Sequence, residues 1–437
     1  MDPVDIGILS VIAIVVTIYL GVYIPVALAG VSFVTIWLVS DKPILAVNFL
    51  RQAIGDSVTE YEFATIPLFT FMGLIVSKAG LGTDVYRVMN QLFQRIRGGV
   101  GMATVGANAL FAAVTGSSIA SASVFTRVAV PEMLRLNYNK RFAVGVVAGS
   151  SVLGMIIPPS SMLIIYAFVA EISVGDMFIA GIIPGLILTL AYIGSIAAMG
   201  WLTPDFIGGT SPDRTAGNRL SYSEILSCTA PVLALILIVL GGIYTGWLTP
   251  VEAGAAGSLA ALIIAVIRKE MTWRSFWDAL LETGHITASI LFLITAASFY
   301  SRMLGYVDLP NQLQEFLVGN DLGFFWVMVA YVLLMLFLGT LLDTASVILI
   351  VVPLFIDIIE PMGLSLVWFG IITVIGAEIG LLTPPLGISC FVIKTTLNDD
   401  RISLKDVFMG ALPFAAVMLM ILILLIWQPG LSTYLLN

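Results

Sequence analysis

Two short stretches of this chain place a proline pair inside apolar sequence, a few residues after a glycine. The first reads Gly154-Met-Ile-Ile-Pro158-Pro159-Ser160-Ser161, and the second reads Gly380-Leu-Leu-Thr-Pro384-Pro385-Leu386-Gly387. Proline has no amide hydrogen and its ring clashes with the preceding turn, so carbonyls upstream of it lose their helical partners. Freed carbonyls can bind a cation, and a helix that restarts beyond the break offers unpaired N–H groups to an anion. The chemistry expected here is therefore the binding of a cation by the freed carbonyls and of an anion by the unpaired N–H groups.

A stretch of small and hydroxyl-bearing residues precedes each proline pair, at 115–123 and at 336–346. Hydroxyl and carbonyl oxygens near a bend are neutral, hard ligands suited to Na⁺, and glycine allows the backbone to approach an ion closely. Small residues also allow membrane helices to touch, which is the alternative reading of either stretch alone. The pairing of each stretch with a proline break favours ion binding.

These stretches and breaks define two sets of candidate residues. The candidate cation-binding residues are Ser117, Ser118, Ser121, Gly154, Ile157, Pro158, Gly339, Thr340, Asp343, Thr344, Gly380 and Thr383. The candidate substrate-binding residues are Ser123, Arg127, Ser160, Ser161, Ser346 and Gly387. Arg127 could attract a carboxylate substrate or could serve as a cytoplasmic anchor, and the same two readings hold for Lys394.

Two acidic residues, Asp343 and Glu378, lie inside apolar sequence. A carboxylate there is costly unless it is paired, protonated or bound to an ion. Asp343 could instead cap a hairpin helix near water, and Glu378 could instead hydrogen-bond to backbone. The single histidine, His285, opens an apolar segment and is expected to be a packed interfacial residue rather than a proton relay.

The composition of the chain limits the classes of protein to which it can belong. Of its 437 residues 59% are hydrophobic and 11% are charged, and the mean hydropathy is +1.07, which indicates a multi-pass membrane protein. A net charge of −8 argues against nucleic acid as a partner. The sequence has no Cys/His/carboxylate cluster for zinc or haem, no phosphate-binding loop and no His-Glu-x-x-His helix, so we expect neither a cofactor nor enzymatic activity. The first residues lack a basic region, so the first apolar run is read as a span rather than a signal peptide.

The two proline pairs are 226 residues apart (384 − 158), and other matches recur at nearly the same offset. Gly21 and Pro25 match Gly246 and Pro250, for example. One half of the chain is therefore read as a diverged copy of the other. A broken helix at corresponding positions of two repeats is the best sequence indication of a transporter's binding site.

The predicted fold is all-α, with two inverted-topology repeats of about five spans each. The first repeat, 1–200, has scaffold spans at 1–78, a surface arm helix at 80–98, a re-entrant hairpin at 101–135, a broken helix at 142–172 and a span at 177–200, with residues 42–51 read as a connector. A linker covers 201–225. The second repeat, 226–437, has scaffold spans at 226–301, a polar loop at 302–322, a hairpin at 323–360, a broken helix at 366–397 and a last span at 407–427.

The distribution of Lys and Arg predicts the orientation of these segments. The connectors 78–97, 127–141, 201–222 and 268–274 are basic and are expected on the cytoplasmic side, whereas 302–322 holds only Arg302 and is expected outside. Both assignments hold only if 101–135 enters and leaves the membrane on the cytoplasmic side and 323–360 enters and leaves it on the outer side, so that both are re-entrant hairpins. An odd number of spans then inverts the second copy relative to the first.

The quoted motifs also carry a family resemblance. The run from Thr115 to Phe125, the basic-flanked Pro131-Glu132-Met133 and both proline breaks resemble the large membrane subunit of tripartite ATP-independent periplasmic (TRAP) transporters, over essentially the whole chain. The resemblance implies an elevator-type, Na⁺-coupled importer of organic acids, such as C4-dicarboxylates or sialic acid, in the bacterial inner membrane. It also implies two partners, a small four-span membrane subunit and a periplasmic substrate-binding protein.

Two other readings compete with this one. A stand-alone secondary Na⁺/carboxylate symporter would have the same inverted hairpins but no binding protein. An intramembrane aspartyl protease would need two membrane aspartates, and Asp343 is nearly alone in this respect. The sequence does not name the organic acid.

Overall fold

The structure is a computed structural model that describes residues 3–209, 220–319 and 323–436. Those residues are almost entirely helical and contain no β-strand, only an isolated bridge between Tyr138 and Gly208. The prediction of an all-α protein is therefore confirmed.

The helices of the first half follow the apolar runs of the sequence. They are α1 (Pro3–Tyr19), α2 (Ile24–Ser40), α3 (Pro43–Thr59), the 3₁₀ turn η1 (Tyr61–Ala64), α4 (Thr65–Lys78), α5 (Leu81–Phe93), α6 (Gly99–Thr115), α7 (Ser118–Arg135), α8 (Lys140–Ser151), α9 (Leu153–Ile156), α10 (Ser161–Val169), α11 (Val174–Leu202) and α12 (Pro204–Ile207). Glycines with positive φ mark several ends, such as Gly80 before α5 and Gly116 after α6.

The second half has a similar order of elements. It comprises α13 (Tyr222–Ile236), the π-helical turn η2 (Leu237–Gly241), α14 (Gly242–Tyr244), α15 (Pro250–Ile267), α16 (Trp273–Tyr306), α17 (Leu309–Gly319), α18 (Phe324–Gly339), α19 (Thr344–Ile359), α20 (Leu366–Leu381), α21 (Ile388–Leu397), α22 (Leu404–Trp427) and α23 (Gly430–Thr433). Capping boxes begin α13 at Ser221, α15 at Thr249 and α22 at Ser403, which satisfies N–H groups that a helix start leaves free.

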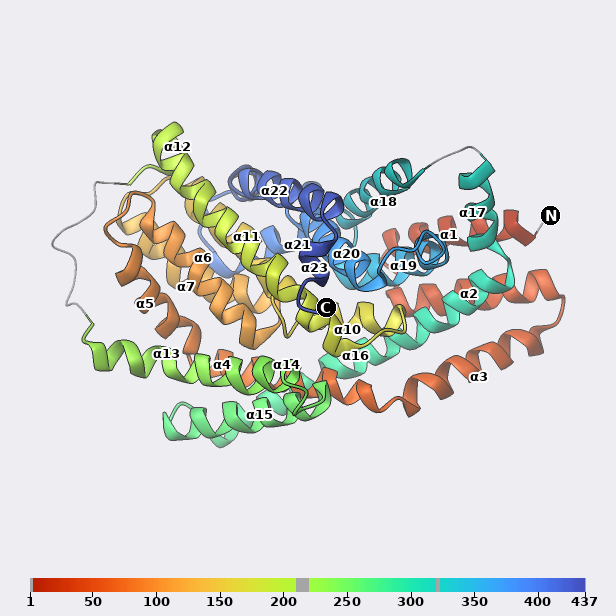
Figure 1. The fold of residues 1–437 in the computed structure, drawn as a ribbon, viewed down its shortest axis with the longest axis horizontal. Helices are drawn as coiled ribbons and strands as arrows, with labels where there is room; N and C mark the ends of the chain where they lie inside the picture. The colour runs from red at the N-terminus through yellow and green to blue at the C-terminus, as the bar shows by residue number, and fades with distance from the viewer. Residues whose placement is uncertain (1–2, 210–219, 320–322, 437) are drawn as a thin grey trace.

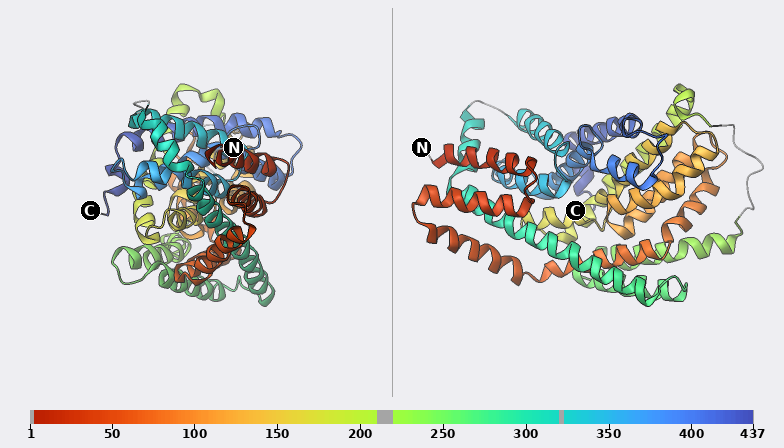
Figure 2. Two further views of the ribbon diagram at one scale, coloured as in Figure 1. Left: turned by 90° about the vertical axis from the view of Figure 1, so that its right-hand side faces the viewer. Right: turned by 180° about the vertical axis from the view of Figure 1, so that it is seen from behind.

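The helices form two groups that lie against each other. Helices α2, α3, α4, α15 and α16 pack together along one side of the molecule, at the lower edge of Figure 1, and we call them the scaffold group. Helices α6–α11 and α18–α22 pack together on the opposite side, and we call them the hairpin group; the two views of Figure 2 show the same division. Helix α5 turns by 63° from α4 and packs on α6 and α7, so it connects the two groups.

Within the hairpin group, α8 and α22 pack in very close contact. A Cβ added to Gly145 would lie 2.1 Å from the Gly410 carbonyl oxygen, and one added to Gly410 would lie 1.9 Å from that of Arg141. At the end of this contact the Asp406 carboxylate forms ion pairs with Lys140 and Arg141, with N···O distances of 2.8 and 3.0 Å. Small residues permit such close approach between apolar helices.

Several described helices are long and apolar enough to cross a membrane. Five meet that test by length and composition, or up to seven if each bent pair counts as one span. The bent pairs are 61–78 with 81–93, and 140–156 with 161–169, the second bent by 45°. Seven shorter apolar helices accompany them, among them α6, α18, α19 and α20.

The structure corrects the sequence analysis in two places. Residues 42–51 are not a connector, because Lys42 is the N-cap of the 17-residue helix α3 and residues 43–51 lie within it. Residues 302–322 are not simply a loop, because α16 continues to Tyr306 and α17 occupies Leu309–Gly319. Of the expected linker at 201–225, residues 210–219 lie outside the described residues, as do 320–322.

Candidate functional site

The tip of the first hairpin is the turn between α6 and α7. Gly116 has φ +59°, and a Cβ added there would lie 2.3 Å from the Pro159 carbonyl oxygen, so glycine is required by both conformation and space. Ser117 caps α7, because its hydroxyl accepts from the Ala120 amide at 3.3 Å. The tip therefore lies directly against the proline break, as the pairing of the two stretches in the sequence analysis predicts.

The first break separates α9 from α10 and contains a cis peptide bond between Pro158 and Pro159. Within the described structure the carbonyls of Ile157, Pro158 and Pro159 accept no hydrogen bond. The Ser161 amide and hydroxyl both donate to the Gly116 carbonyl, at 3.4 and 3.1 Å, and so join the break to the tip. The break leaves carbonyl oxygens available for a cation.

The second hairpin and break repeat this arrangement. Asp343 caps α19, accepting from the Ser346 amide at 3.3 Å and from the Ser346 hydroxyl. Pro384 and Pro385 are joined by a cis bond, and the Leu386 amide donates to the Thr340 carbonyl of the tip at 3.3 Å. Thr383 donates its hydroxyl to the Gly380 carbonyl at 2.9 Å.

One glycine in each break sets the distance between break and tip. A Cβ added to Gly154 would lie 2.8 Å from the Ser117 carbonyl oxygen, and one added to Gly380 would lie 2.4 Å from the Gly339 backbone. Real Cβ atoms essentially never come that close to backbone. Both positions therefore require glycine for packing, and cation binding by their carbonyls stays a prediction.

Glu378 lies near the second tip, on α20, and is fully buried. Its Oε1 accepts from the Thr344 hydroxyl at 2.7 Å, and its Oε2 has no partner among the described residues. The partner is thus a side-chain hydroxyl of the hairpin rather than backbone, the alternative left open by the sequence. Thr344 is the first residue of α19 and follows the Asp343 cap.

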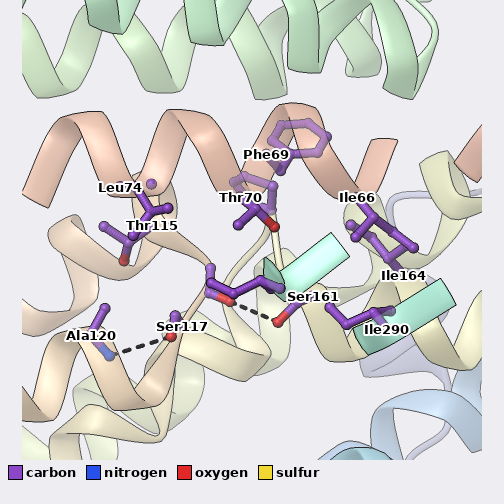
Figure 3. A pocket seen from close by; sticks show the side chains of 14 residues that line it. Ile66, Phe69, Thr70, Leu74, Thr115, Ser117, Ala120, Ser161, Ile164 and Ile290 are labelled. Atoms are coloured by element: carbon purple, nitrogen blue, oxygen red, sulfur yellow. Dashed lines mark hydrogen bonds between the residues drawn. The ribbon is translucent and has the colours of Figure 1, made fainter. Parts of the chain in front are cut away.

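A cleft of about 120 Å³ lies between the first tip and the scaffold group (Figure 3). Its polar wall comes from the tip and break, with Thr115, Ser117 and Ser161. Its apolar wall comes from the scaffold helices α4 and α16, with Ile66, Phe69, Leu74, Ile286 and Ile290. Thr70 of α4 adds a hydroxyl to that wall (Figure 3). An apolar cleft with a few converging polar groups is the usual form of a small-molecule site.

The sequence analysis did not find the scaffold side of this cleft. Gly73 of α4 touches the tip so closely that an added Cβ would lie 2.7 Å from the Thr115 carbonyl oxygen. A lone glycine or threonine in an apolar helix has no distinguishing pattern, so only the three-dimensional packing identifies Gly73 and Thr70.

The remaining predicted residues are distributed unevenly around the two sites. Ser118 and Ser121 are buried on α7, and neither hydroxyl has a partner in the part of the chain that the structure describes. The Ser160 hydroxyl donates to the Met155 carbonyl at 2.5 Å and accepts from the Leu163 amide, so it caps α10. Ser123 is half-buried, Arg127 is exposed on α7, and neither lines the cleft.

Two predicted residues of the second site are occupied by structural contacts. The hydroxyl of Ser346 is held by Asp343. Gly387 has φ +41°, and an added Cβ would lie 2.4 Å from the Phe408 ring. Lys394 donates to the Asp399 carbonyl at 2.8 Å, at the end of α21.

The overall fold is similar to that of two solved transporters. It matches the YdaH transporter of Alcanivorax borkumensis with a TM-score of 0.64 at 14% identity, covering 88% of this chain and 89% of that one. It matches MtrF of Neisseria gonorrhoeae with a TM-score of 0.65 at 12% identity, covering 98% and 94%. The chain therefore has the fold of a polytopic membrane protein of the kind found in these transporters.

A narrower assignment comes from sequence relatives. Residues 11–431 match the model of the DctM component of tripartite ATP-independent periplasmic transporters, and the chain belongs to this family. It is 30% identical to the C4-dicarboxylate TRAP transporter large permease protein DctM of Pseudomonas aeruginosa, over 90% of each chain. It is 27% identical to the sialic acid large permease SiaM of Vibrio cholerae (86% of this chain, 87% of the relative) and to the 2,3-diketo-L-gulonate large permease YiaN of Escherichia coli (88% and 89%). These relatives are transporter permease subunits rather than enzymes.

Proposed function

We propose that this chain is the transport subunit of a Na⁺-coupled importer of organic acids in the bacterial inner membrane. The observation that carries the proposal is the pairing of each hairpin tip with a proline break, which brings unpaired carbonyls next to hydroxyl or carboxylate oxygens. Oxygen ligands of this kind suit Na⁺, and the helix that restarts after each break offers N–H groups to a carboxylate. The relatives' names, which include C4-dicarboxylate, sialic acid and 2,3-diketo-L-gulonate, support an organic acid as substrate.

The same family membership supports two partners, a small membrane subunit and a periplasmic binding protein. The alternative is a stand-alone symporter, and co-purification of the expressed operon separates the two. A complex that contains a small membrane subunit supports the proposal, and full uptake by this chain alone contradicts it.

The central experiment is uptake into proteoliposomes that contain this chain and its small subunit. Binding protein loaded with labelled substrate is added outside, with a Na⁺ gradient, a proton gradient or neither. Uptake that needs inward Na⁺ supports the proposal. Uptake at full rate without Na⁺ overturns it.

We further propose that the two halves are inverted repeats. The offset of 226 residues superimposes Ser117 on Asp343, both helix caps, and Gly154 on Gly380, both packed on a tip. Single cysteines at Asn137 and Gln312, in a background lacking Cys228 and Cys390, should be labelled from opposite sides of the membrane. Labelling from one side excludes the inversion.

The proposed motion is an elevator, in which the hairpin group moves past the scaffold group as one body. The tight α8–α22 contact lies within the hairpin group, whereas the cleft lies between the two groups. Cysteines at Thr70 and Ser117, on opposite walls of the cleft, should stop uptake when joined by a bifunctional thiol reagent. Each single cysteine treated in the same way is the control, and full uptake by the joined protein contradicts the elevator.

A further inference from the structure

Helix α5 packs closely on the first hairpin. A Cβ added to Gly82 would lie 2.9 Å from a methyl carbon of Val124 on α7 and 3.1 Å from the Phe111 ring on α6. One turn later, the Tyr86 ring packs edge-on against Phe125 of α7, with the ring centroids 6.4 Å apart. Side chains that interlock this closely leave no space for one helix to slide along the other. Helix α5 is therefore expected to move with hairpin one rather than with α4, from which it turns by 63°.

One side chain of α5 contacts the scaffold group instead. Asp84, in the first turn of α5, forms an ion pair with the guanidinium of Arg268, which caps the C-terminus of α15. A cation at that end of a helix is also favoured by the helix dipole. Among the described residues no other ion pair joins α5 to the scaffold group. The pair thus spans the boundary at which the proposed motion takes place.

The burial of Asp84 makes this contact more than a surface ion pair. Asp84 is 8% exposed, and Arg268 is half-buried. An exposed ion pair contributes little because water screens it, whereas losing one partner of a buried pair leaves an uncompensated charge. Arg87 lies 3.9 Å from the Asp84 carboxylate, but it is on the same helix and is mostly exposed. When α5 leaves α15, Arg87 stays with Asp84, and only the bond to Arg268 is lost.

The second arm helix has no acid at the equivalent position. Helix α17 begins at Leu309 and packs on α19 of the second hairpin, as α5 begins at Leu81 and packs on the first. Three residues after these starts stand Asp84 in α5 and Gln312 in α17, and a neutral amide cannot form an ion pair. An interaction at only one end favours the conformation in which it is formed, and so it shifts the equilibrium between the two conformations.

We propose that Asp84 and Arg268 form a latch between the hairpin group and the scaffold group. The ion pair is closed in the conformation described here, opens when the hairpin group moves, and sets the resting balance between the two conformations. Both are positioning residues, because neither lines the cleft beside the first tip. The latch rests on the proposed motion of the hairpin group. A pair that stayed closed throughout the cycle would instead be a fixed pivot.

Cross-linking distinguishes a latch from a pivot. In the cysteine-free background, Asp84→Cys and Arg268→Cys joined by a short bifunctional thiol reagent should stop Na⁺-driven uptake into proteoliposomes. The matched control joins Lys78→Cys and Glu282→Cys, which replace an ion pair between α4 and α16 with an N···O distance of 3.7 Å. Both of those helices belong to the scaffold group, so uptake should continue. Full uptake by the first cross-linked protein, or arrest of both, overturns the latch.

Thiol labelling measures the conformational balance without transport. Ile164→Cys replaces a 1% exposed residue of α10 that lines the cleft, so a thiol reagent reaches it only when the two groups separate. In the purified complex of this chain with its small subunit, Arg268→Gln should make this labelling about tenfold faster, as fits an ion pair between the exposed and buried limits. Arg268→Lys, which keeps the charge, and Arg87→Gln should change the rate by less than about twofold. An unchanged rate for Arg268→Gln overturns the latch.

A second labelled position separates the latch from a loss of folding. Ala148→Cys lies at a fully buried position of α8, inside the hairpin group. Arg268→Gln should leave its labelling rate unchanged, whereas equal acceleration of both cysteines would show a merely structural role and refute the proposal. If Arg268→Gln does not fold, Asp84→Asn combined with Arg268→Gln removes both charges and should give the same acceleration at Ile164→Cys. If Na⁺-driven uptake fails in the unmodified protein, the proposed function falls, whereas the labelling rates still decide the latch.

Discussion

At equivalent positions of the two hairpins, Ser117 caps α7 with a neutral hydroxyl and Asp343 caps α19 with a carboxylate. The same offset sets Val152 against Glu378. The backbone is shared: both breaks contain a cis proline pair, and both donate an amide hydrogen bond to the facing tip. Geometry is thus common to the two sites, whereas acidic charge belongs only to the second.

The two sites also differ in what covers them. Pro158 and Pro159 are buried, and α4 lies against the first tip through Gly73. Pro384, Pro385 and Leu386 are exposed. In this conformation the first break is covered and the second is exposed.

This comparison separates two tasks that a single site would combine. The glycines and prolines hold each tip at a fixed distance from unpaired carbonyls, and that task needs no charge. In the proposed cation sites the carboxylate would strengthen binding, because an ion–carboxylate interaction is stronger than one with neutral oxygens alone. The second site should therefore bind its cation more tightly than the first.

The largest expected effect comes from removing the charge at the second cap. Asp343→Asn should raise the Na⁺ concentration for half-maximal uptake by about 10–100-fold, since interactions of charged groups contribute about 1.5–3 kcal/mol. Ser117→Ala, which removes a neutral cap, should raise it by only about fivefold, for roughly 1 kcal/mol. Asp357→Asn, on an exposed position of α19, is the control. Equal shifts at both caps would remove the distinction between the sites.

The close backbone packing that the two sites share can be disrupted by substitution of Gly154 or Gly380. Gly380→Ala should destabilise the protein by about 2–3 kcal/mol and Gly154→Ala by about 1–2 kcal/mol, because overpacking costs grow with the closeness of the clash. The added Cβ lies 2.4 Å from backbone in the first case and 2.8 Å in the second. Denaturant unfolding in detergent measures both, with Gly194→Ala, which meets nothing within 4 Å, as the control. A more stable Gly380→Ala protein would show that the second tip is not packed as described.

The smallest expected effect comes from the hydrogen bonds that join each break to its tip. The first break uses a side-chain hydroxyl as well as an amide, whereas the second uses a backbone amide. Ser161→Ala removes the hydroxyl bond to Gly116 and should cost about 0.5–1.5 kcal/mol of stability. Leu386→Ala leaves the amide bond to Thr340 intact on an exposed residue, so its change should stay within about 0.5 kcal/mol. The same unfolding assay compares them, and a larger loss for Leu386→Ala would reverse the assignment.

The breaks and hydroxyl stretches were predictable because proline and glycine act on the backbone locally. The caps at Ser117 and Ser160 follow from short-range preferences of the same kind. Helix α3 was missed because Asn48, Arg51 and Asp56 interrupt its apolar pattern, and the structure places Asp56 in an ion pair with Arg302 of α16. The same pair lies where α16 runs past the predicted end of its span.

The long-range parts of the site were not predictable from spacing. Glu378 and Thr344 are 34 residues apart, and Gly73 meets Thr115 from another helix. Such contacts depend on how helices pack, and a single sequence carries no record of that packing. The hydroxyls of Ser160 and Ser346 have the right chemistry to bind a ligand. In the structure they donate hydrogen bonds to the Met155 carbonyl and to the Asp343 carboxylate.

The close contact between α8 and α22 has a consequence for biosynthesis. Arg141 meets Asp406 across 265 positions of sequence, and Gly145 meets Gly410 beside it. At roughly 5–20 residues per second, the ribosome completes α22 on the order of tens of seconds after α8. During that interval the glycine face of α8 has no partner, so a chain truncated before residue 404 would carry both hairpins and yet leave the support of the first one open to lipid or to quality-control proteases.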